Sequence, residues 1–95
     1  MGKYNEWKNT VTKECYDYIE LTGDIQNKYT SFVINCDYGV YELAKRIRED
    51  IDIKISEAIQ TVDNTLIANL LYAITYEIDY VEIATEIFHQ AQNYI

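Results

Sequence analysis

The chain of 95 residues contains no proline, and its only glycines are Gly2, Gly23 and Gly39. An all-β fold needs a turn about every ten residues, and tight turns depend largely on glycine and proline. This scarcity of turn-forming residues argues against such a fold. A chain of this length forms a single domain, and its hydrophobic fraction of 48% is enough to build one core without disulfides or metal.

The apolar residues of the first half recur at helical spacing. One stripe ends at Gly23, a residue suited to the left-handed cap of a helix C-terminus. This stripe consists of Trp7, Val11, Cys15, Tyr18 and Thr22. The next segment fits a helix with the apolar residues Ile25, Tyr29, Phe32, Val33 and Cys36. Residues 29–36 are also rich in β-branched and aromatic types, which leaves a strand over these residues as the alternative.

The second half is predicted to hold three further helices. Asp37 can cap the first, which buries Val40, Leu43, Ala44, Ile47 and Ile51. A short helix over residues 52–61 follows. Asp63 or Asn64 then caps a helix with the stripe Leu66, Ile67, Leu70, Leu71, Ile74 and Ile78. Asp79 and Glu82 have capping-box spacing. They open a last helix that buries Tyr80, Ile83, Ala84, Ile87, Ala91 and Tyr94.

The predicted fold is therefore all-α, a compact bundle of four to five helices that forms one domain over residues 1–95. Cys15 and Cys36 lack metal-binding spacing and are predicted to be reduced thiols in or near the core. No apolar run is long enough to cross a bilayer, and residues 1–10 lack the apolar segment of a signal peptide. These features predict a cytoplasmic protein that does not enter the membrane.

The formal net charge of −8 lies entirely in the C-terminal half. Residues 1–48 carry seven basic and seven acidic groups, whereas residues 49–95 carry nine acidic groups against Lys54 alone. Binding to nucleic-acid phosphates or to an anionic membrane requires a basic surface. The charge distribution therefore argues against direct binding to either.

The sequence contains no recognisable catalytic or metal-binding constellation. His89 is the only histidine, the three glycines are too scattered for a phosphate-binding loop, and metal-ligand spacings are absent. We therefore predict no enzymatic activity, no cofactor and no metal. A small-ligand pocket would have to use Lys45, Arg46 or Arg48.

Tyrosines and carboxylates are the candidates for partner binding. Of ten tyrosines, Tyr38, Tyr41, Tyr72 and Tyr76 lie off or at the edge of the predicted buried stripes, and exposed tyrosines are frequent binding anchors. Carboxylates spread along helices can imitate the phosphates of DNA, although a solvated acidic face that confers solubility has the same pattern. The predicted partner-binding residues are Glu49, Asp50, Asp52, Tyr72, Tyr76, Glu77, Asp79, Glu82 and Glu86.

Three segments resemble motifs of a family of short acidic proteins encoded by phages and other mobile elements. Residues 4–9 (YNEWKN) resemble the family's YNGW-N start, and residues 37–44 (DYGVYELA) resemble its DEGLYxLA segment. Residues 69–84, with NLLYAI and IDYVEIA, are similar to its DLLxxAL…VDWxEIA helix pair, with Tyr80 in place of tryptophan. The resemblance implies a mobile-element setting, in which small acidic proteins often block host defence.

Charge and resemblance together predict an inhibitor of a host DNA-binding defence enzyme, such as a CRISPR effector or a restriction enzyme. It would bind that enzyme through an acidic, DNA-mimicking surface. The alternative is a self-associating structural or regulatory module, a homodimer in which tyrosine-rich helix faces meet across a two-fold axis.

Overall fold

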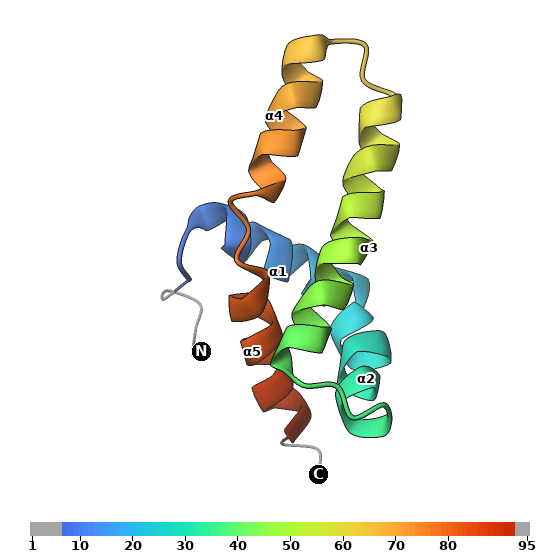
Figure 1. The fold of residues 1–95 in the computed structure, drawn as a ribbon, viewed down its shortest axis with the longest axis vertical. Helices are drawn as coiled ribbons and strands as arrows, with labels where there is room; N and C mark the ends of the chain where they lie inside the picture. Colours follow the sequence, from blue (N-terminus) through green and yellow to red (C-terminus); the bar gives the residue numbers. More distant parts are fainter. Residues whose placement is uncertain (1–6, 93–95) are drawn as a thin grey trace.

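The computed structural model describes residues 7–92, and within that range it contains helices and loops but no strand (Figure 1). The helical elements are α1 (Thr10–Thr22), the π-helical segment η2 (Ile25–Tyr29), α2 (Thr30–Asn35), α3 (Val40–Gln60), α4 (Thr65–Thr75) and α5 (Tyr80–Gln92). The predicted all-α fold is confirmed. Tyr94 and residues 4–6, which the sequence predictions used, lie outside the described residues.

Helix α1 begins and ends at strong local signals. The Thr12 N–H donates to Asn9 Oδ1 at 2.8 Å, and Gly23 closes the helix at φ 84°, as predicted. Its buried residues are Thr12, Cys15, Tyr16 and Ile19. Of the predicted stripe, Cys15 is buried and Trp7 and Val11 are partly buried, whereas Tyr18 and Thr22 are exposed, so the prediction was wrong at these last two. The helix is rotated so that Ile19 enters the core while Tyr18 remains in contact with water.

Residues 25–35 are helical, so the strand alternative is wrong. Ile25, Tyr29 and Val33 are all buried at four-residue spacing, which a helix places on one face. A strand would alternate its side chains and would put Ser31 on the same face as Tyr29 and Val33. Cys36, just beyond α2, is an exposed free thiol rather than a core residue. Cys15 is buried and free, and burial raises the pKa of its thiol to about 11.

Helix α3 is continuous from Val40 to Gln60, so the predicted separate helix over residues 52–61 does not exist. No glycine or proline interrupts this stretch, and the alternating isoleucines near its middle simply lie on different sides of one helix. The helix starts at Gly39, whose N–H donates to Glu42 Oε1 at 3.0 Å. Asp37 is not the cap; it adopts φ 60° in the loop before it.

The core lies at one end of the molecule, where α3 and α5 pack together over α1, η2 and α2 (Figure 1). Its centre is formed by the predicted faces of α3 and α5. The fully buried aliphatic side chains there include Leu43, Ile47, Ile83 and Ile87. Burying each such side chain stabilises the fold by roughly 1.5–3 kcal/mol.

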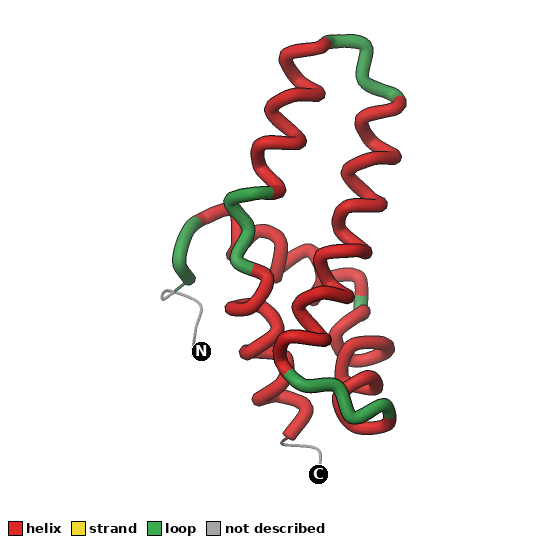
Figure 2. Tube along the Cα trace, in the orientation of Figure 1, coloured by secondary structure: helices red, strands yellow, loops and turns green. Residues whose placement is uncertain are grey.

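The other end of the molecule is a helical arm. We use this name for the last part of α3 (residues 52–60), the loop at residues 61–64 and α4, which extend away from the core in Figure 2. No residue of the arm is buried. The predicted burial of the α4 stripe is therefore wrong: Leu71 and Ile78 are only partly buried, and the exposed members are Leu66, Ile67, Leu70 and Ile74. They are exposed because, within residues 7–92, α3 is the main helix that packs against α4.

Candidate functional site

A pocket between α3 and α4 brings together three of the predicted partner-binding residues. Asp52 comes from α3, and Tyr72 and Tyr76 come from the end of α4. The pocket has a volume of about 200 Å³ and is completed by Arg48, Ile55, Ser56 and Thr75. Arg48 Nε lies 3.8 Å from Asp52 Oδ2, one turn apart on α3. The pocket therefore combines two tyrosine side chains with an exposed ion pair.

Sequence reasoning included Asp52 but did not place it beside Arg48, Ile55 and Ser56, because it ended a helix at Ile51. On a continuous helix, Arg48, Asp52 and Ile55 follow the spacing i, i+4 and i+7 and share one face. That spacing was the signal available in the sequence.

Helix α4 exposes two different sides. At about 100° per residue, Tyr72 and Tyr76 project roughly opposite to the row formed by Leu66, Leu70 and Ile74. Between the two sides lie Ala68, Leu71 and Thr75, which are the partly covered residues of this helix. We call the first side, together with Asp52 and Arg48, the tyrosine face. The second side, with Ile67, is the aliphatic face.

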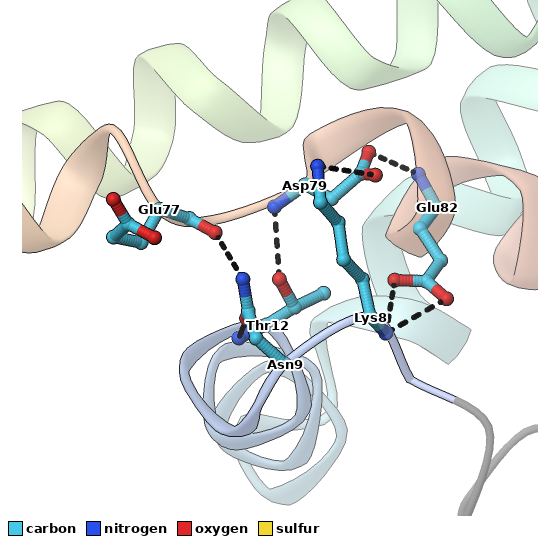
Figure 3. A network of polar contacts seen from close by, with 6 residues as sticks. All are labelled: Lys8, Asn9, Thr12, Glu77, Asp79 and Glu82. Carbon is cyan, nitrogen blue, oxygen red and sulfur yellow. Dashed lines mark hydrogen bonds and ion pairs between the residues drawn. The ribbon is translucent and has the colours of Figure 1, made fainter.

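Two predicted site residues, Asp79 and Glu82, are instead engaged in holding the chain together at the start of α5 (Figure 3). Glu82 N–H donates to Asp79 Oδ1 at 3.0 Å, so Asp79 caps the helix as predicted. The Glu82 carboxylate does not complete a capping box. It accepts the Lys8 N–H at 3.0 and 3.2 Å, while the Asp79 N–H donates to Thr12 Oγ1 at 2.9 Å.

The same network fixes the loop between α4 and α5 through its backbone. Asn9 Nδ2 donates to the Glu77 carbonyl oxygen at 2.8 Å, and Lys8 Nζ lies 3.9 Å from Asp79 Oδ2. The Glu77 carboxylate points away from these contacts (Figure 3). The start of α1 is thereby tied to the start of α5, and the base of the arm is anchored on the core.

Asp50, also predicted to bind a partner, lies in a half-buried polar cluster with groups of its own chain. It accepts a hydrogen bond from the Tyr29 hydroxyl at 2.7 Å and pairs with Lys28 Nζ at 2.9 Å and Arg46 Nε at 3.3 Å. Burial opposes ionisation of Asp50, but the hydrogen bonds and the two cations hold its pKa below the usual value. Burial, reinforced by the Asp50 carboxylate, raises the pKa of Tyr29. Asp50 therefore stabilises the fold from within.

The remaining predicted carboxylates are less constrained. Within residues 7–92, Glu49, Glu77 and Glu86 make no ion pair, and only Glu86 accepts a side-chain hydrogen bond, from Gln90 at 3.3 Å. The predicted set of seven carboxylates therefore divides into two kinds. Asp50, Asp52, Asp79 and Glu82 form ion pairs or hold another segment of the chain, while Glu49, Glu77 and Glu86 form no ion pair with the described residues.

A second hollow, of about 430 Å³, gathers three cations beside the α5 start. Lys8, Lys45 and Arg48 line it together with Tyr41, and the Asp79 carboxylate shares the same space. The ring of Tyr80 lines it too, but its hydroxyl is buried without a hydrogen-bond partner among the described residues. Arg46 is not part of this hollow; it is held by Asp50.

Comparison with protein-family models, with curated proteins and with solved structures found no match to this chain. Among residues 7–92, no group of three or more His, Cys, Asp or Glu side chains is placed to hold a metal ion. In the same part of the chain, no helix combines the length and apolar character needed to span a bilayer.

Proposed function

We propose that this protein is a mobile-element inhibitor that binds a host DNA-binding defence enzyme, such as a CRISPR effector or a restriction enzyme, in the host cytoplasm. It acts by protein–protein contact and neither catalyses a reaction nor binds nucleic acid. The observation that carries the proposal is the tyrosine face, where Tyr72 and Tyr76 stand exposed on an arm beside an acidic side chain.

The tyrosine face has the composition of a protein-binding site. Tyr76 exposes 79% of its surface and Tyr72 exposes 50%, and neither phenol is needed to fill the core. Tyrosines supply large contact area at a low cost in conformational entropy and are enriched among the residues that dominate binding energy. Arg48 can release Asp52 at little cost, because an exposed ion pair of this kind contributes less than about 1 kcal/mol.

The pattern of internal ion pairs supports an acidic binding surface. Five cations of the described chain pair with aspartates, namely Lys8, Lys13, Lys28, Arg46 and Arg48. The surplus negative charge therefore resides largely on glutamates such as Glu49, Glu77 and Glu86. A protein that normally holds DNA presents lysine and arginine, and would be attracted to such a surface in a salt-dependent manner. The resemblance to mobile-element proteins supports the same setting.

The first test is capture of partners from a lysate of cells with active defence systems, using the tagged full chain at low and then high salt. We expect a nuclease to be retained at low salt and released by salt or by competing DNA. Tyr72→Ala combined with Tyr76→Ala should reduce capture at least tenfold. Tyr18→Ala is the matched control, because Tyr18 exposes 41% of its surface on α1, outside the tyrosine face.

A second pair of variants tests the acidic contribution. Replacing Glu49, Glu77 and Glu86 together by lysine should abolish capture while circular dichroism shows the helices unchanged. Reversal of Glu14 and Glu20 on α1, two exposed glutamates outside the predicted site, should have little effect. Capture that survives the triple reversal would exclude the mimicry proposal. An equal loss of capture in the Glu14 and Glu20 control would show that binding depends on net charge in general and not on the predicted site.

A further inference from the structure

The aliphatic face of α4 is the largest feature of the fold that no internal packing explains. Leu66 exposes 64% of its surface, Leu70 50%, Ile67 44% and Ile74 38%. Single exposed aliphatic residues are common on protein surfaces, but four neighbouring ones on a helix form a patch of the kind that marks an interaction site. We propose that this face binds the same face of a second copy of the chain, forming a symmetric dimer through α4.

The charge of the molecule restricts where a second copy can bind. The chain carries a net charge of −8, so two copies repel each other over most approaches. Among the described α-helices, only α2 (Thr30–Asn35) and α4 (Thr65–Thr75) contain no charged residue, and of these two only α4 carries several exposed aliphatic side chains. Two copies can therefore meet along α4 without burying a charge or opposing like charges at the centre of the contact.

The spacing of the face is self-complementary. Leu66, Leu70 and Ile74 form a ridge with four-residue steps, and Leu70 lies at its midpoint. When two such helices cross about a two-fold axis through Leu70, Leu66 of each copy lies near Ile74 of the other. Ridges with this spacing interdigitate at a crossing angle of about −50°, a common geometry between helices. A different protein could bind this face without a ridge that is symmetric about Leu70.

The exposed area indicates a dimer that dissociates on dilution. Each of the four aliphatic side chains exposes about half of its surface, which amounts to roughly 400 Å² on each copy. Stable interfaces bury about 800 Å² on each partner, and smaller ones are typically weak. The tyrosine face lies on the other side of α4, so dimer formation leaves it accessible and the dimer would present it twice.

The test is sedimentation equilibrium of the full chain from about 10 µM to about 1 mM. We expect a monomer–dimer equilibrium in the parent protein and at least a tenfold weaker association in Leu70→Glu. Leu21→Glu is the control, because Leu21 is an exposed leucine at the end of α1. A protein that remains monomeric at the highest concentration overturns the proposal, and so does a dimer that Leu70→Glu leaves intact.

Two further readouts fix the geometry and separate this dimer from binding to a defence enzyme. In a Cys36→Ser background, Leu70→Cys should form an intermolecular disulfide on mild oxidation, whereas Tyr76→Cys should not. Added salt should preserve or strengthen the dimer, because it screens the repulsion between two anionic copies. Capture of a basic partner should instead weaken with salt. Failure of Leu70→Cys to cross-link faster than Tyr76→Cys would exclude the two-fold axis at Leu70.

Discussion

Helices α4 and α5 carry similar apolar patterns, yet one lies outside the core and the other forms its centre. In α5, Ile83 and Ile87 lose all contact with water against α3, and small alanines beside them allow close approach. In α4, the apolar row faces solvent because its main neighbour within residues 7–92, α3, covers a different side of the helix. The difference shows that an apolar stripe indicates a helix face that is suited to burial. It does not indicate whether the same chain or another molecule covers that face.

The largest expected effect comes from substituting one isoleucine in each of the two helices. Ile87→Ala should lower the free energy of unfolding by about 2–5 kcal/mol, because it leaves a cavity at a site with 0% exposure. Ile74→Ala, at a site with 38% exposure, should cost less than about 1 kcal/mol in dilute protein. Urea unfolding followed by circular dichroism measures both. Equal losses would mean that α4 belongs to the core.

A second test compares two aspartates of α3 that lie on either side of the boundary between core and arm. Asp50→Ala should destabilise the fold by about 1–3 kcal/mol, because it leaves the buried Tyr29 hydroxyl without its acceptor. Asp52→Ala removes only an exposed ion pair with Arg48 and should cost less than about 1 kcal/mol. A larger loss of stability for Asp52→Ala than for Asp50→Ala would show that contacts at the start of the arm contribute to stability at least as much as those of the core.

The Asp50 contribution should also depend on pH. Its pKa in the folded protein lies below that of an unfolded aspartate, which is about 3.9. The carboxylate therefore stabilises the fold above that unfolded value, and the stabilisation is lost as the pH falls through the folded pKa. The difference in stability between the parent and Asp50→Ala should accordingly shrink as the pH falls below about 5. A stability difference that does not change with pH would show that the ionised Asp50 carboxylate is not the source of the stabilisation.

The smallest expected effect concerns the junction between the two regions. Asp79→Ala removes the cap of α5 and should cost about 0.5–2 kcal/mol. Glu77→Ala keeps the carbonyl that accepts from Asn9 and should change stability by less than about 0.5 kcal/mol. Hydrogen exchange at the first turn of α5 would localise the loss. Faster exchange in the Glu77 variant would place its carboxylate in the junction after all.

Much of the local structure could be predicted from the sequence. Gly23 marked the end of α1 and Asp79 the start of α5, and of the two predicted caps of α4, Asp63 or Asn64, Asn64 is the cap. Each cap depends on the chemistry of one residue and its immediate neighbours. The exposure of Tyr72 and Tyr76 also followed from their position off the apolar stripe. These features depend on contacts within about one helical turn, which the order of residues specifies directly.

The roles of the carboxylates could not be predicted in this way. Asp50 is neutralised by Lys28 and contacts Tyr29, which precede it by more than twenty residues, and Glu82 holds the backbone of Lys8 near the other end of the chain. Such pairings depend on how the helices pack. A helical wheel shows these side chains as equivalent to Glu49 or Glu86, which remain available at the surface.

The sequence by itself determined that the chain is helical, where α1 ends, where α4 and α5 begin, and that its negative charge accumulates in the second half. Only the tertiary structure decided that α3 and α5 share the core while α4 stands out as an arm. The physical reason is that helix formation is governed by local hydrogen bonds and side-chain spacing. Burial depends on which surfaces meet in space, and several arrangements of the same amphipathic helices satisfy the same local rules.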